Sequence, residues 1–385
     1  MTEERGSALW QLGFRPFYLL AAIFAAISVG VWTAQFAGIL PWVGHSGPPW
    51  HGHEMIFGYA LAVIAGFLFG IVRNWTQRPT PTGAALALIV ALWLAGRVLV
   101  YTPWGAAIAL ANIAFMTAVA IGVAVPLWQA RSRQNYLFIG LLALVLAALV
   151  LFHLSALDWI ALPAWVGLQA GLDGILLVIA AVAGRVVPIY ANNAVPGARA
   201  RRSQNVERLA MGSLFVLLVA DLLALPAIVL IVVLTATALV HAWRLRLWDC
   251  RSALRVPLLW VLYLAYAWIP VHLVLRALHE ADWVARPLAV HAFTIGTIGG
   301  MTMAMMIRTA RAWTGRALTA DAADVACCVL LATAAVLRVF WPLLAPAQQM
   351  DATVYSGVLW SAAFLLFAVR HAPALLRPRP DGRPG

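Results

Sequence analysis

The sequence of 385 residues contains no lysine, and only 10% of its residues are charged. Soluble domains carry about 25% charged residues, so this scarcity excludes an ordinary soluble fold. Hydrophobic residues make up 64% of the chain, far more than a single membrane anchor needs. We therefore predict an all-α polytopic protein that is embedded in the lipid bilayer.

Cysteine is scarce as well, with three residues in the chain. Cys250 lies in a basic loop, and Cys327 and Cys328 are neighbours inside an apolar run. No Cys-x-x-Cys-His sequence is present, which excludes covalent c-type haem, and no disulfide framework is implied. Residues 1–11 lack a cleavable signal pattern, so the first apolar run is expected to stay as a helix.

All 26 basic residues are arginines, and with 14 acids they give a formal net charge of +12. Such an excess can indicate nucleic acid, but these arginines lie between apolar runs, so membrane topology explains them and no nucleic-acid partner is expected. They gather before the first run and after each even-numbered run, which places both termini in the cytoplasm by the positive-inside rule. The twelve runs, each near the length that crosses a bilayer, cover residues 16–40, 53–73, 84–102, 105–128, 136–156, 163–187, 208–223, 225–243, 256–278, 287–308, 322–344 and 352–372.

Two of these runs are related by an ungapped shift of 238 residues. Each opens on a histidine and closes on an arginine about 30 Å away along a helix, which is one hydrocarbon core. Small residues recur at every fourth position in both runs and predict a side for close helix packing, roughly opposite the histidine. The matched positions are His53 with His291, Gly58 with Gly296, Gly66 with Ala304, Arg73 with Arg311, Trp75-Thr76 with Trp313-Thr314, and Arg78 with Arg316.

The histidines share one membrane depth in this topology. Seven of the nine fall near the outer face, namely His45, His51, His53, His153, His272, His279 and His291. We interpret His53 and His291 as the main pair, because one imidazole from each of two facing helices can hold a buried haem. The alternative is a pair of interfacial histidines that are bonded to loop carbonyls.

His51 and His53 form a His-x-His at a helix start, which is a candidate copper pair. Both can face one ligand only if the helix begins between them, because they are about 200° apart on a helix. Glu54 is a candidate catalytic residue, since it could fix the tautomer of a ligating histidine or carry protons. Its alternative role is that of an acid in the first helical turn, favoured by the helix dipole.

His272 and Arg276 lie on one face of their helix, four residues apart, as a possible metal ligand and a partner for a haem propionate. Arg97 and Arg338 are two further arginines of the outer half that suit propionates. The alternative for all three arginines is that they extend to the membrane interface.

His153 and Asp173 complete the candidate set. His153 is a further possible metal ligand at the outer end of its helix. Asp173 is the second candidate catalytic residue: an acid in the middle of an apolar run needs a partner or belongs to a proton path. A structural arginine partner is the alternative.

Several short stretches together suggest a known family. They are Gly13-Phe14-Arg15-Pro16-Phe17-Tyr18-Leu19-Leu20, Trp50-His51-Gly52-His53-Glu54-Met55-Ile56-Phe57-Gly58, Asn74-Trp75-Thr76, Gly184-Arg185-Val186-Val187-Pro188, Gly299-Gly300-Met301-Thr302 and Thr314-Gly315-Arg316. These stretches resemble the NnrS family of bacterial membrane proteins, which contain haem and copper and act in nitric oxide metabolism. The likeness spans nearly the whole chain and implies haem b and copper as cofactors, nitric oxide as the ligand, and the bacterial inner membrane as the location. One departure is Ala312-Trp313, where the family often has Gly-His.

A fainter likeness is to the catalytic subunit of haem-copper oxidases and nitric oxide reductases, which has twelve helices in three groups of four. It implies three four-helix units here, at 13–130, 131–250 and 251–376. However, residues 163–223 contain no histidine, whereas that superfamily takes its copper ligands from the corresponding helices.

These observations predict a haem protein, with copper, that binds and helps to detoxify or reduce nitric oxide near the periplasmic side. Reduction would also need an electron donor, which no motif identifies, so an enzyme and a sensor or sink both stay open. A different class of function is a twelve-helix secondary transporter of a metal ion or small anion, with the outer histidines as its entry site.

Overall fold

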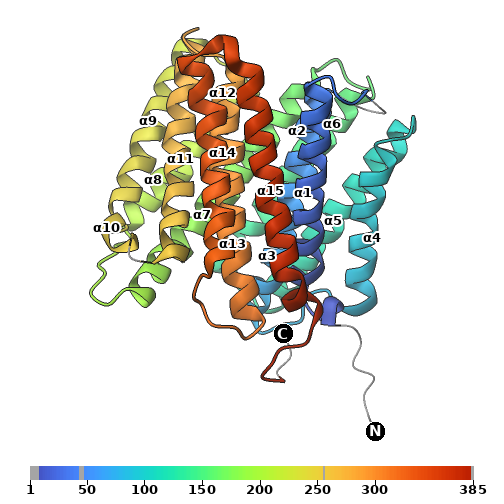
Figure 1. Cartoon of the computed structure of the whole chain (residues 1–385), viewed down its shortest axis with the longest axis vertical. Helices are drawn as coiled ribbons and strands as arrows, with labels where there is room; N and C mark the ends of the chain where they lie inside the picture. The colour runs from blue at the N-terminus through green and yellow to red at the C-terminus, as the bar shows by residue number, and fades with distance from the viewer. Residues whose placement is uncertain (1–7, 43–46, 255, 383–385) are drawn as a thin grey trace. The chain divides into compact units, whose positions relative to one another are not determined.

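The computed structural model describes residues 8–42, 47–254 and 256–382, and His45 lies outside these ranges. Within them the chain is helical and contains no strand (Figure 1). The prediction of an all-α protein is therefore confirmed for the described residues.

Each of the twelve predicted apolar runs coincides with a helix, and ten of these are long and apolar enough to cross a membrane in the described part of the chain. The other two are α4 (Gly83–Leu99), which has 17 residues, and α8 (Gln204–Leu222), which carries three charged residues. The ten are α1 (Phe14–Phe36), α2–η2–α3 (Pro48–Thr76), α5 (Gly105–Gln129), α6 (Leu137–Ala156), α7 (Ala164–Ala194), α9 (Ala227–Arg246), α11 (Pro257–Glu280), α12–η4–α13 (Arg286–Trp313), α14 (Ala322–Leu344) and α15 (Gln349–Leu376).

The chain forms two compact units. The first comprises Met1–Gly174, Met306–Leu318 and Phe364–Gly385, and the second comprises Ile175–Met305 and Thr319–Ala363. Both units are discontinuous in sequence, because late helical segments return to each. The division into three four-helix units stays a prediction.

The internal repeat is visible as a shared irregularity of the backbone. A short helix, α2 (Pro48–His53), leads into a π-helical segment, η2 (Glu54–Ala60), and then α3 (Leu61–Thr76). In the second copy α12 (Arg286–His291) leads into the π-helical segment η4 (Ala292–Gly299) and α13 (Gly300–Trp313). The two histidines thus end equivalent short helices, and the π-helical segments begin 238 residues apart.

The small residues of the repeat allow close helix packing, as predicted. A Cβ added at Gly66 would lie 3.0 Å from Cβ of Phe17 in α1. A Cβ added at Gly300 would lie 2.9 Å from Cβ of Ala265 in α11. In each copy, therefore, the glycine faces the long helix that precedes the π-helical one.

In the first unit a buried arginine of α1 is bonded to the C-terminal end of α15. Arg15, which is 0% exposed, donates from Nη1 to the carbonyl oxygens of Leu375 at 2.9 Å and Arg377 at 2.8 Å. Figure 1 shows the start of α1 and the end of α15 at the same end of their helices. The guanidinium satisfies carbonyls at the C-terminal end of α15, which have no intrahelical partner.

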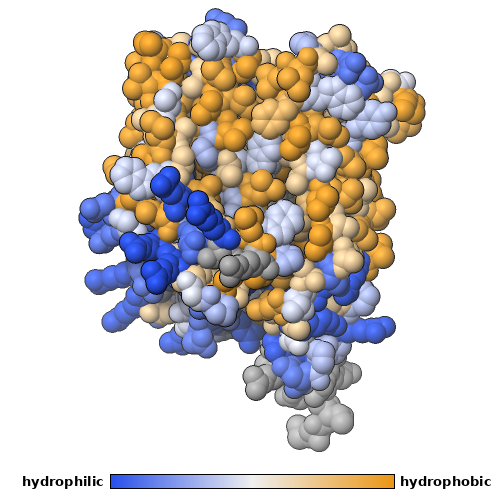
Figure 2. Space-filling view, turned by 60° about the vertical axis from the view of Figure 1, so that its left-hand side comes forward, coloured by the Kyte–Doolittle hydropathy of each residue, from blue (hydrophilic) through white to orange (hydrophobic). Residues whose placement is uncertain are grey.

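The surface of the helices is apolar. On the face shown in Figure 2, hydrophobic side chains cover the helices, and hydrophilic ones gather toward one end. Exposed tryptophans lie at helix ends, as in the aromatic belts of membrane proteins. They include Trp104, Trp128, Trp159, Trp243 and Trp283.

Candidate functional site

His53 ends α2 inside an aromatic enclosure of the first unit. Its side chain is 0% exposed, and its ring stacks on Phe152 of α6 with a centroid distance of 4.8 Å. The rings of Trp50 and Phe57 lie at 5.1 Å and 5.5 Å. Because this enclosure removes the ring from solvent, its two nitrogens require partners within the protein.

Both nitrogens of His53 have such a partner. Nδ1 lies 2.9 Å from Oε1 of Glu54, and Nε2 lies 3.2 Å from Nε2 of His153. Because an ionised carboxylate only accepts hydrogen bonds, Nδ1 of His53 donates to Glu54. Nε2 of His53 then carries the lone pair, and this lone pair faces the second imidazole. This is the contact that the predicted tautomer-fixing role of Glu54 requires.

Glu54 is also half of a buried ion pair. Arg97 of α4 donates from Nη1 to Oε2 of Glu54 at 2.9 Å, and from Nη2 to Oδ1 of Asn112 in α5. The side chains of Arg97 and Glu54 are 6% and 11% exposed. A buried carboxylate is costly without a compensating charge, and Arg97 supplies that charge beside the imidazole.

The π-helical segment η2 lets the guanidinium approach its backbone. Gly58 has no side chain, and a Cβ there would collide with Nη1 of Arg97. The indole nitrogen of Trp93 donates to the carbonyl oxygen of Gly58 at 2.9 Å. π-Helical turns are frequent at functional sites, and this one carries the carboxylate that is bonded to the histidine.

His51 does not join His53 on one ligand in this arrangement. The helix begins at Pro48, before both histidines, so they point to different neighbours. The ring of His51 stacks on Trp32 of α1 at a centroid distance of 4.3 Å. The predicted role of His51 as a metal ligand stays a prediction, while His153 takes the place beside His53.

The second unit holds the other two predicted ligands. His272 of α11 is 2% exposed and donates from Nδ1 to the carbonyl oxygen of Ala289 in α12 at 2.7 Å. His291 ends α12, and its Nδ1 donates to the carbonyl oxygen of Pro287 at 2.7 Å. Since His53 belongs to the first unit and His291 to the second, their pairing on one haem stays a prediction.

The three predicted propionate arginines differ in their partners. Arg97 pairs with Glu54, and Arg276 donates from both terminal nitrogens to Asp221 of α8 at 2.9 Å and 2.7 Å. Arg338 of α14 has no hydrogen bond with any residue that the structure describes at its buried Nη1. All three residues are at most 8% exposed.

Asp173 lies on α7 and is 2% exposed. Nε2 of Gln169, one turn earlier, donates to its Oδ1 at 3.0 Å. A partner was predicted for this acid, and the structure shows a neutral amide of the same helix bonded to one of its two oxygens. A catalytic role for Asp173 stays a prediction.

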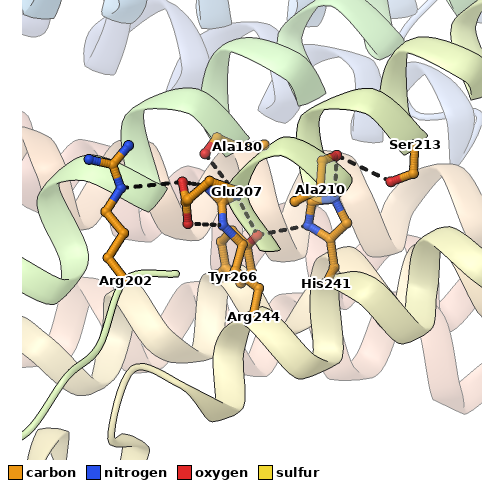
Figure 3. Close-up of polar contacts among 8 residues, drawn as sticks. All are labelled: Ala180, Arg202, Glu207, Ala210, Ser213, His241, Arg244 and Tyr266. Atoms are coloured by element: carbon orange, nitrogen blue, oxygen red, sulfur yellow. Dashed lines mark hydrogen bonds and ion pairs between the residues drawn. The ribbon is translucent and has the colours of Figure 1, made fainter. Parts of the chain in front are cut away.

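The second unit contains a further buried polar network, which Figure 3 shows. Arg244 of α9 donates from Nε to Oε1 of Glu207 at 2.9 Å and from Nη1 to the hydroxyl of Tyr266 at 2.9 Å. That hydroxyl lies 2.7 Å from Nδ1 of His241. A Cβ at Gly184 would lie 2.6 Å from Cζ of Arg244, so this glycine of α7 provides the space for the guanidinium. The network joins four helices through one cation.

Sequence reasoning missed Asn112, Trp93 and the Glu207–Arg244 pair. Asn112 interrupts an otherwise apolar run of α5, which is a signal that could have marked it as a buried polar partner. Trp93 had no such signal, because tryptophans are frequent throughout the chain.

The facing nitrogens of His53 and His153 are the donor atoms that a small metal ion could use here. Nε2 of His53 faces His153 instead of an open space. Two imidazole nitrogens at about 2.0–2.1 Å from one tetrahedral ion lie about 3.3 Å apart, close to the 3.2 Å that separates these atoms. Among the described residues no group of three or more His, Cys, Asp or Glu side chains is placed to hold a metal ion.

The apolar helices and their buried imidazoles define a multi-pass α-helical membrane protein. A family model described as NnrS protein matches residues 8–379, and the chain therefore belongs to the NnrS family. No curated protein matches the chain. Family membership and the membrane helices fit a nitric-oxide-related membrane protein of a haem-associated family.

Proposed function

We propose that this protein is a bacterial inner-membrane protein of nitric oxide metabolism that binds copper at His53 and His153 and also binds haem b. The observation that carries the proposal is the pair of buried Nε2 atoms 3.2 Å apart, with Glu54 bonded to the far nitrogen of His53. A carboxylate behind a ligating histidine fixes its tautomer and raises its basicity.

The chain's own residues define what this site does. Glu54 accepts a hydrogen bond from Nδ1 of His53 at one oxygen and a hydrogen bond from Arg97 at the other. Phe152, Phe57 and the other rings exclude water. An apolar, water-free site inside the membrane suits nitric oxide, which is small and uncharged and dissolves in lipid.

Haem requires an axial imidazole, and His272 and His291 supply candidates in the second unit. In each, Nδ1 donates to a backbone carbonyl, which leaves Nε2 as the nitrogen that can bind iron. When bound, the haem would supply an iron position that binds nitric oxide. The predicted axial role of His53 is less favoured, because its Nε2 is directed at His153.

The test is the metal and pigment content of the purified full-length protein in detergent. We expect a Soret band and bound copper. His53→Ala and His153→Ala should each remove most of the copper, because each deletes one of two nitrogen ligands. His279→Ala is the matched control, since its Nδ1 is bonded to the carbonyl of Val284 in a loop.

Copper that stays at the wild-type level in both variants would refute the proposed ligands. A colourless protein without a Soret band would refute haem binding and favour the transporter hypothesis. Glu54→Gln should lower copper affinity about 10- to 100-fold while both ligands remain.

A further inference from the structure

Arg338 lies on α14 in the second unit and is 6% exposed. Its Nη1 is fully buried and has no hydrogen-bond partner among the residues that the structure describes. No salt bridge to Arg338 is found within the same ranges. An arginine cannot escape burial by losing its proton in a protein, so its charge persists.

The surroundings of Arg338 on its helix are apolar. Ala335 and Val339, three residues before it and one after it, are 1% and 0% exposed. They belong to a packed cluster that also contains Trp268, Leu275, Ala289 and Ala292. These residues come from α11, α12 and η4 and supply no charged side chain. A cation held beside such a core is unfavourable unless an anion accompanies it.

The internal repeat shows how the related arginine of the first unit is neutralised. Arg97 is bonded to Glu54 and Asn112. The shift of 238 residues replaces Glu54 by Ala292, so the position of the carboxylate partner becomes apolar. The position of Arg97 itself becomes Ala335, one helical turn before Arg338. The second copy thus keeps an arginine on this helix without the carboxylate that balances it in the first.

We propose that the guanidinium of Arg338 binds a small monovalent oxyanion, nitrite or nitrate, within the second unit. The flat guanidinium fork matches two oxygen atoms of one planar anion, as it does in bidentate contacts with carboxylates. A single charge on the anion balances the single cation. The inference does not depend on copper or haem at the other sites.

A carboxylate has the same two-oxygen geometry and could reach Arg338 either as a free acid or on a haem propionate. The experiment therefore uses sodium nitrite, sodium nitrate, sodium acetate and sodium chloride at equal ionic strength. Detergent-purified full-length protein is unfolded by heat in each salt, and tryptophan fluorescence gives the midpoint Tm. Arg338→Gln is the test variant, and Arg370→Gln, at an exposed position of α15, is the control.

We expect nitrite or nitrate to raise Tm by about 3 °C or more at saturation in the wild type and in the control variant, and not in Arg338→Gln. In chloride alone, Arg338→Gln should be at least as stable as the wild type, because it removes a buried charge that lacks a partner. Haem content, measured on the same samples, should be equal in the wild type and Arg338→Gln.

Three results would overturn the proposal. One is a nitrite or nitrate effect that persists in Arg338→Gln. Another is a large loss of stability of Arg338→Gln in chloride, which would show that a protein group already balances the charge. The third is a response to acetate alone, or a loss of haem from the variant, which would assign the arginine to a carboxylate.

Discussion

The ion pair between Glu54 and Arg97 should couple the two residues strongly in a double-mutant cycle of Glu54→Gln and Arg97→Met. Their charged atoms are 2.9 Å apart, and both side chains are almost fully buried. At an effective dielectric constant of about 20, two unit charges at that distance attract by about 6 kcal/mol. Because removal of one partner leaves the other as a buried charge without a counter-charge, each single variant should lose about 3–5 kcal/mol of stability.

The double variant should lose less than the sum of the two singles, since it leaves no charge stranded. We expect a coupling energy of about 2–3 kcal/mol from unfolding in mixed micelles, followed by tryptophan fluorescence. Asp351→Asn, an exposed acid in the first turn of α15, should change stability by less than about 0.5 kcal/mol and serves as the control. Costs that simply add would show that the two charges do not interact, and the reasoning about this site would fail.

Two further predictions concern the second unit. Gly184→Ala should destabilise by about 3 kcal/mol or more, because its Cβ would displace the buried ion pair of Arg244, whereas Gly212→Ala, with open space around it, should be neutral or slightly stabilising in the same unfolding assay. Burial raises the pKa of the Cys250 thiol, whose Sγ donates to a backbone carbonyl. Its alkylation should therefore be slow at pH 8 and rise only above the pH at which a free thiol reacts, as mass spectrometry of labelled peptides would show; rapid labelling at pH 8 would contradict this.

The helices could be predicted from sequence because the chain gives two independent signals for them. Apolar runs of bilayer length recur, and arginines mark alternate loops, so the run that became α8 was placed despite its charges. The repeat of His53 and His291 was also visible, since an ungapped shift aligns both ends. The structure adds that the two copies share a π-helical segment at the same place.

The π-helical segments themselves could not be predicted. A sequence can reveal an extra residue in a helical turn only when polar residues shift from one face of the helix to another. Residues 55–72 carry no charge, so no such shift is visible there. The contact of His53 with His153 was missed for a related reason. It joins α2 to α6 across 100 residues, and no local pattern encodes which of several histidines at one depth will meet.

The partners of the buried arginines could not be predicted from sequence either. Arg97, Arg276 and Arg338 looked equivalent in sequence, as cations in the outer halves of apolar runs. The structure gives the first two a carboxylate from another helix and gives the third none among the described residues. Which acid reaches which cation depends on helix packing, so their roles could be separated only in three dimensions.

The contact between Arg15 and the end of α15 sets an order for biosynthesis. The guanidinium belongs to the first long helix, but its acceptor at Arg377 is synthesised 362 residues later. A ribosome must therefore finish nearly the whole polypeptide before this contact can form and the first unit can reach its final structure.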